Sequence, residues 1–231
     1  MNTKSIYTDG QYIKDNPNWH MEDSSWKLLK IIDCIQKHQL EFKTVAEVGC
    51  GAGEILNQLS IKMPDKIFKG YEISPQAFSL CEEKSKNNLS FSLSDILQKN
   101  EYFDILLCID VFEHIENYIY FLKKLKNKAK YHLFHIPLDI SISSVLRVSP
   151  ILFARSKVGH IHSFTKETGL AVLQDSGYEI VDYFYTAGAV ELNPKSWKTM
   201  LAKIPRQIIY TINPDFAVRL MGGYSLMVLT K

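Results

Sequence analysis

The sequence contains no apolar run long enough to cross a bilayer. A membrane helix needs about 20 consecutive apolar residues, and no stretch of the 231 residues comes near that length. A basic segment followed by an apolar one, which would mark a secretory signal, is also missing from the first residues. These absences predict a soluble, cytoplasmic protein without a membrane span.

A strong net charge and paired cysteines are missing as well. Lysine and arginine number 27 against 25 acidic residues, so the formal net charge is only +2, which gives no electrostatic footprint for nucleic acid. The four cysteines show no C-x-x-C spacing, as is typical of reduced thiols in the cytoplasm. The composition is 46% apolar and 23% charged, as expected for one globular domain spanning residues 1–231.

One short stretch carries the strongest signal. Residues 44–54 read T-V-A-E-V-G-C-G-A-G-E, in which an apolar run with one acid, Glu47, precedes alternating glycines and a helical pattern. The glycines are Gly49, Gly51 and Gly53. Glycine is favoured where the backbone needs a positive φ or passes close to a ligand, and a helix start offers free N–H groups to a polar or anionic group. The stretch predicts a strand, a turn and a helix that bind a nucleotide-type cofactor.

The spacing of these glycines argues against a phosphate-binding turn. The dinucleotide fingerprint would need a glycine at position 54, where the chain has Glu54, and the Gly-Lys-Ser/Thr of a P-loop is absent. The pattern E-x-G-x-G-x-G resembles that of the class I S-adenosylmethionine (SAM) dependent methyltransferases. The resemblance implies that the turn wraps the amino-acid end of SAM, with Glu47 under the turn or facing the ligand's ammonium group. A tight corner without a ligand is the alternative.

A second acid lies at the end of the next expected strand, residues 67–73. Glu72 follows the glycines by the interval of about 20 residues at which Rossmann-like folds place a carboxylate for the ribose hydroxyls. A carboxylate has two acceptor oxygens and suits a cis-diol. We therefore assign Glu72 and its neighbour Ile73 to the cofactor site.

A third acid follows the expected strand 89–93. In the resembled family an aspartate at this corner accepts a hydrogen bond from the exocyclic amine of adenine, while the next residue covers the ring. Asp95 and Ile96 match these two positions. By itself Asp95 would be only a loop acid.

The run 103–110 is almost continuously apolar, which predicts a central parallel strand that is buried on both faces. It delivers the sequence D-V-F-E-H to the same carboxyl edge as the other acids, and Asp110 is assigned to the cofactor site. His114 is a candidate general base beside the methyl acceptor, because imidazole titrates near neutrality. Alternatively, Asp110, Glu113 and His114 share a helical face and hold a divalent metal, or they pair structurally. The preferred interpretation has no metal.

The segment 159–165, G-H-I-H-S-F-T, resembles an acceptor-side segment of the same family. Its two histidines, His160 and His162, point to one side if the segment is extended, and both are candidate bases. The alternative is a structural role, in which one of the two imidazoles bonds to backbone. Whether His160 completes a metal site with His114 is left open.

The resemblance implies an α/β fold, a Rossmann-like seven-stranded sheet in the order 3-2-1-4-5-7-6 with strand 7 antiparallel and helices on both faces. Residues 1–38 would form an arm and a helix over the pocket, with the motif W-H-x-E-D-S-x-W-K at residues 19–27. Residues 138–164 and 188–221 have no counterpart in the minimal fold. Long insertions in compact domains are usually functional, and we expect these two to form a helical lid on the acceptor side.

The expected activity is methyl transfer from SAM to a small polar acceptor, with S-adenosylhomocysteine (SAH) as product. Oxygen and nitrogen acceptors both remain open, as do a monomer and a homodimer. Basic residues outnumber acidic ones in 188–221, which suits a solvated surface, an anionic acceptor or a dimer face. The W-H-x-E-D-S and G-H-x-H-x-F stretches resemble methyltransferases of bacterial capsule biosynthesis, including the O-methyl phosphoramidate type. A metal-assisted O-methyltransferase of a quinone or lipid precursor and a SAM-binding protein without turnover are the alternatives.

Overall fold

Seven strands form one mixed sheet in the computed structural model, which describes residue 19, residues 21–193 and residues 197–231. The sheet has the order β3-β2-β1-β4-β5-β7-β6, and β7 runs antiparallel to both of its neighbours while the other pairs are parallel. The strands are β1 (Thr44–Val48), β2 (Ile67–Glu72), β3 (Leu89–Leu93), β4 (Phe103–Ile109), β5 (Ala129–Pro137), β6 (Ile180–Thr186) and β7 (Ser225–Thr230). The expected order and the antiparallel last strand are confirmed.

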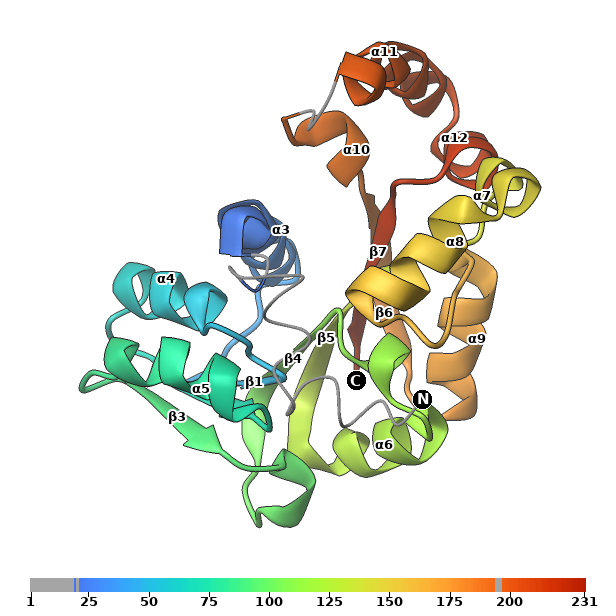
Figure 1. Cartoon of the computed structure of the whole chain (residues 1–231). Coiled ribbons are helices and arrows are strands. Elements are labelled where there is room, and N and C mark those ends of the chain that lie inside the picture. The colour runs from blue at the N-terminus through green and yellow to red at the C-terminus, as the bar shows by residue number, and fades with distance from the viewer. Residues whose placement is uncertain (1–18, 20, 194–196) are drawn as a thin grey trace.

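Helices cover both faces of the sheet (Figure 1). They are α3 (Ser24–Lys37), α4 (Glu54–Lys62), α5 (Pro75–Cys81), α6 (Tyr118–Leu125) and α9 (Lys166–Asp175), with two further groups in the insertions. Along β4, Ile105 and Leu107 face α3 and α4 in one apolar cluster, whereas Leu106 and Cys108 face α6 and α9 in the other. Side chains alternate between the faces of a strand, so a continuous apolar run makes a strand that is buried on both sides.

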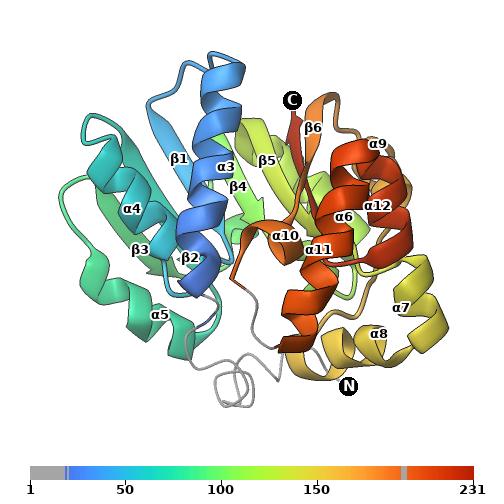
Figure 2. The same ribbon diagram turned by 90° about the horizontal axis from the view of Figure 1, so that it is seen from above.

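The carboxyl ends of the parallel strands lie at one edge of the sheet, which is seen from above in Figure 2. β1 leads there into the glycine turn and α4, β2 ends at Glu72, and β4 ends just before Asp110. Because ligands of open α/β sheets bind at this edge, the fold brings the predicted cofactor residues together.

The two insertions are helical and touch one another. The first contains α7 (Ile142–Arg147), α8 (Ser149–Phe153) and a π-helical turn (Ala154–Val158), and the second contains α10 (Gly188–Glu191), α11 (Trp197–Ile212) and α12 (Pro214–Met221). α12 packs against α7, and the Ser143 hydroxyl donates to the Met221 carbonyl over 2.9 Å. That the insertions close as a lid remains a prediction.

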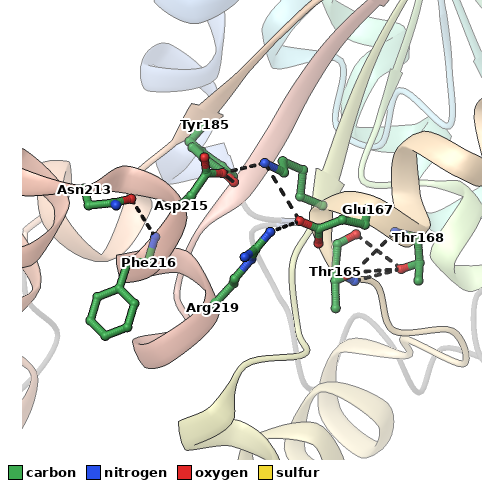
Figure 3. A network of polar contacts seen from close by, with 9 residues as sticks. Thr165, Glu167, Thr168, Tyr185, Asn213, Asp215, Phe216 and Arg219 are labelled. Carbon is green, nitrogen blue, oxygen red and sulfur yellow. Dashed lines mark hydrogen bonds and ion pairs between the residues drawn. The ribbon is translucent and has the colours of Figure 1, made fainter.

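A polar network attaches the second insertion to the rest of the domain (Figure 3). Arg219 of α12 pairs with Glu167 of α9 at 2.5 Å, and the Tyr185 hydroxyl of β6 donates to Asp215 of α12. α12 is thereby fixed against β6 and α9 as well as against α7.

Parts of the expected N-terminal arm lie outside the described residues. These are residues 1–18 and His20, so the arm over residues 1–38 is described only at Trp19 and from Met21 onward. Among the described helices, none combines the length and apolar character that a bilayer crossing requires.

His132 on β5 gives the fold a measurable pH dependence. Burial lowers its pKa from 6.5 to about 4, so between these values the unfolded chain binds a proton that the folded chain does not. The free energy of unfolding therefore falls as the pH drops through this window, by about 1.4 kcal/mol per pH unit from this group. We predict that His132→Phe lowers the slope in urea titrations from pH 6.5 to 4.5 by this contribution and leaves the contributions of other buried groups in place. The control Tyr131→Phe keeps the wild-type slope, and equal slopes for His132→Phe and wild type would contradict the assignment.

Candidate active site

The glycines of the turn differ in the space around them: one is closed by packing and another is open to a ligand. All three glycines have positive φ angles. At Gly53, which begins α4, an added Cβ would lie 2.6 Å from the Phe91 ring, so this position is closed by packing. At Gly51 the nearest described atom to such a Cβ is 3.9 Å away, on the Trp19 ring. Gly51 is therefore the part of the turn that a ligand can approach closely.

Glu72 connects the turn to the end of β2. One of its carboxylate oxygens accepts the Gly51 N–H over 2.9 Å, and the other accepts the N–H groups of Ile73 and Ser74, each over 2.8 Å. Burial raises the pKa of this carboxyl, while the three backbone donors oppose the rise. The backbone bonds fix the carboxylate at the edge where the ribose is expected, and the oxygen that accepts the Gly51 N–H keeps further acceptor capacity.

Glu47 lies beneath the turn, in β1. It is buried, and its Oε2 atom has no hydrogen-bond partner among the described residues. Burial raises its pKa well above the ordinary value, the charge of Lys27 opposes the rise, and the neighbouring Glu72 adds to it. A buried acceptor without a donor is costly, and a ligand ammonium group would supply one.

Further residues assigned to the cofactor site lie at the ends of β2 and β3. Ile73, which follows Glu72, is 48% exposed. Asp95 uses Oδ1 to accept the Leu97 N–H over 2.9 Å and so caps the turn that follows β3. The side chain of Ile96 is fully buried in the core, so a contact from this residue to the adenine ring would have to come from its backbone.

Asp110 is the centre of a charged network that the sequence did not reveal. Its two oxygens contact Lys27 Nζ at 2.6 Å and His135 Nδ1 at 2.5 Å, and His135 Nε2 contacts the Thr186 hydroxyl at 2.8 Å. Burial alone would raise the pKa of Asp110, but the charges of His135 and Lys27 outweigh it and hold the pKa well below its usual range. Asp110 has a φ of 54°, a strained conformation of the kind that clusters at functional sites.

The three candidate histidines have different partners. His160 Nδ1 lies 2.7 Å from the Asp139 carboxylate, and His114 Nδ1 lies 3.0 Å from the Gly159 carbonyl oxygen. His162 Nε2 lies 3.1 Å from the Ile115 carbonyl oxygen. The rings of His114 and His160 are 5.0 Å apart, so the structure brings these two together.

The hydrogen bonds indicate which nitrogens carry protons. The Gly159 carbonyl only accepts, so Nδ1 of His114 donates and, in the neutral ring, Nε2 keeps its lone pair. Burial, together with the nearby His160, lowers the pKa of His114 from 6.5 to about 4, so this ring is neutral at pH 7. The Asp139 carboxylate accepts the Nδ1 proton of His160 in the same way, so Nε2 of its neutral ring keeps its lone pair.

Glu113 stands beside these two rings. It is fully buried, and neither carboxylate oxygen has a hydrogen-bond partner among the described residues. Its Oε1 atom lies 3.9 Å from His114 Nε2, and burial and the negative charge of Asp110 raise its pKa well above the ordinary value. A buried carboxyl in this position needs a proton or a cation.

Glu113, His114 and His160 together could hold a metal ion. One ligand atom from each lies within 4.8 Å of the others, and oxygen with imidazole nitrogen is a suitable donor set for a divalent cation. Asp110, which the sequence grouped with Glu113 and His114, is instead engaged by Lys27 and His135.

Four residues of the site were not predicted from the sequence: Lys27, His135, Asp139 and Thr186. Asp139 could have been found, because it follows β5 at the carboxyl edge, where the other acids were sought. Lys27 lies in an amphipathic helix 83 residues before its partner, and nothing local distinguishes it from a solvated lysine.

The site and fold agree with a known family. Residues 23–183 match the family model described as a methyltransferase domain. Since this range covers more than half of the chain, the protein belongs to that family. The expectation of a methyltransferase is confirmed by this match. A search of curated proteins by sequence found no match.

Solved structures share the fold at low identity. Magnesium protoporphyrin IX methyltransferase from Synechocystis PCC 6803, with bound SAH, has a TM-score of 0.60 and 16% identity, over 94% of this chain and 86% of that one. A SAM-dependent methyltransferase from Archaeoglobus fulgidus has a TM-score of 0.58 and 18% identity, over 93% and 99%. The N-methyltransferase NodS from Bradyrhizobium japonicum WM9, also with SAH, has a TM-score of 0.55 and 15% identity, over 92% and 87%.

We predict that Glu72→Gln weakens SAM binding by about tenfold or more, because it removes the charge from the expected acceptor of the ribose hydroxyls. Isothermal titration calorimetry with SAM measures the change. Glu41→Gln is the matched control, because Glu41 is exposed and precedes β1 at the opposite edge of the sheet. Equal affinities for wild type and Glu72→Gln would remove Glu72 from the cofactor site.

Proposed function

We propose that the protein transfers the methyl group of SAM to a small polar acceptor, most directly to a hydroxyl group. The observation that carries this proposal is the pair formed by Asp139 and His160, with 2.7 Å between carboxylate and imidazole. It follows the fifth strand at the carboxyl edge, on the side of β4 away from the glycine turn. A carboxylate that orients an imidazole is a recurrent general-base arrangement.

The reaction needs little beyond alignment and a proton acceptor. The sulfonium of SAM already activates the methyl group, so holding the acceptor oxygen in line with the methyl–sulfur bond supplies much of the rate. His160 Nε2 takes the hydroxyl proton as the O–CH₃ bond forms. The electron pair of the broken methyl–sulfur bond stays on sulfur and gives SAH. An amine acceptor would need only its lone pair presented, so N-methylation remains within reach of the same site.

We further propose an identity for the acceptor. The acceptor is a precursor of a bacterial surface polysaccharide, such as an O-methyl phosphoramidate precursor or a sugar. The support is the resemblance of the stretches W-H-x-E-D-S at 19–24 and G-H-x-H-x-F at 159–164. Incubation with methyl-labelled SAM and a panel of phosphoramidate, sugar and amine acceptors tests it. SAH formation with an acceptor of the first two classes is expected. SAM binding without SAH formation on any acceptor would favour a binding protein without turnover.

We predict that His160→Gln lowers the rate of methyl transfer to a hydroxyl acceptor by about 100- to 10,000-fold, the usual contribution of a general base. Its affinity for SAM stays unchanged. His162→Gln is the matched control, because the His162 ring already bonds to the Ile115 carbonyl. A larger loss of rate in His162→Gln than in His160→Gln would reverse the assignment of the base.

A metal-assisted O-methyltransferase of a quinone or lipid precursor is the second candidate function. The fully buried Glu113 favours it, because its oxygens have no hydrogen-bond partner among the described residues and stand beside His114. Glu113, His114 and His160 would hold the ion, which would lower the pKa of an acceptor hydroxyl. In this case His160 Nε2 is a ligand and cannot also be the base, so the two functions are distinguishable.

Metal content separates the two candidates. If the second holds, the purified protein binds Zn²⁺ or Mn²⁺ at one equivalent in calorimetry, and Glu113→Gln weakens binding by about 10- to 100-fold. Removal of the metal with a chelator lowers activity and leaves SAM binding intact. Glu116→Gln, three residues further along the chain, serves as the control. Full activity in a metal-free protein would exclude the metal-assisted function and retain only the general-base function.

A further inference from the structure

A cavity lies beside the Asp139–His160 pair, between the two insertions. Its volume is about 340 Å³, and it opens between the residues after β5 and those before β7. α7 contributes Arg147 to its wall and α11 contributes Arg206. The volume falls in the lower range of small-molecule sites.

The two arginines face this cavity without an acidic partner. Neither guanidinium forms an ion pair with a carboxylate of the described residues, and Arg147 Nε donates only to the Ser143 carbonyl, over 2.9 Å. Arg206 Nε is buried and has no hydrogen-bond partner among those residues. It lies 4.0 Å from the position that a Cβ on Gly223 would take, which places it at the cavity wall.

The electrostatics of the pair favour a negatively charged guest. Burial lowers the pKa of Arg206; the nearby Tyr224 opposes this shift, and the positive charge of Arg147 adds a smaller decrease. The partly buried Arg206 and the exposed Arg147 carry like charges that repel one another, and buried charges in proteins are normally paired. The one acid of the wall, Asp139, already bonds to His160 at 2.7 Å.

We propose that this cavity binds an anionic phosphoryl-type group of the methyl acceptor, through Arg147 and Arg206. The proposal rests on the methyl transfer argued above and specifies the acceptor. A guanidinium presents parallel N–H donors that match two oxygens of a phosphoryl group. Because Asp139 lines the cavity and also orients His160, an acceptor held by its anionic group lies next to the base. The anion thus positions the acceptor next to His160.

Inorganic phosphate is the probe, at constant ionic strength and with acetate as the comparison anion, in isothermal titration calorimetry with the whole chain. We expect phosphate to bind in preference to acetate, and both Arg147→Gln and Arg206→Gln to weaken it by about tenfold or more. Arg206→Lys keeps the positive charge but lacks the parallel N–H donors of a guanidinium, so we expect its affinity for phosphate to lie between those of wild type and Arg206→Gln. Arg155→Gln is the control, because Arg155 is exposed and does not line the cavity.

SAM titrations of the same variants separate the two proposals and report whether each variant is folded. Unchanged SAM affinity with weakened phosphate binding supports the cavity. Unchanged phosphate affinity in Arg147→Gln and Arg206→Gln overturns it and leaves the methyl transfer standing. Stronger binding of acetate than of phosphate overturns the phosphoryl assignment. Phosphate binding by a protein that forms no SAH with any acceptor overturns the proposed function and leaves an anion site.

Discussion

The charge of Asp110 is the constraint on which the arrangement of the site depends. Its carboxylate contacts Lys27 of α3 and His135 of β5, and His135 contacts Thr186 at the end of β6. One side chain therefore connects the helix that precedes the sheet with three of its strands. Loss of any partner would leave a partly buried charge uncompensated, which proteins tolerate poorly. The position of α3 beside the glycine turn follows from this pairing rather than from apolar packing alone.

On the proposed acceptor side, two neighbouring histidines have different surroundings. His114 is neutral because burial depresses its pKa, whereas His160 keeps an acidic partner in Asp139. The same two rings and Glu113 serve as a base with its surroundings or as a ligand set for a cation. The same protein groups take part in both alternatives, so only the presence or absence of a cation between them distinguishes general-base catalysis from metal-assisted catalysis.

The sheet and the cofactor turn could be read from the sequence because their signals are local. The continuous apolar run of β4 is typical of a strand buried on both faces, and the interval from the glycines to Glu72 is typical of Rossmann-like folds. Other features depend on contacts between distant segments. Lys27 gains its role from Asp110, 83 residues away, and His135 faces the site only because β5 pairs with β4. Ile96 was expected over adenine but has its side chain in the core, because a residue pattern fixes a position and not the direction of a side chain.

The second insertion lies wholly beyond the part of the chain that matches the family model, which ends at residue 183. The cofactor half, from the glycine turn to Asp110, lies within that match. If α11 and α12 contact the acceptor as proposed, a mutation there would alter which acceptor binds without changing the residues proposed to hold the methyl donor. Selection on a new substrate would act on these two helices first, and related proteins should diverge most steeply there.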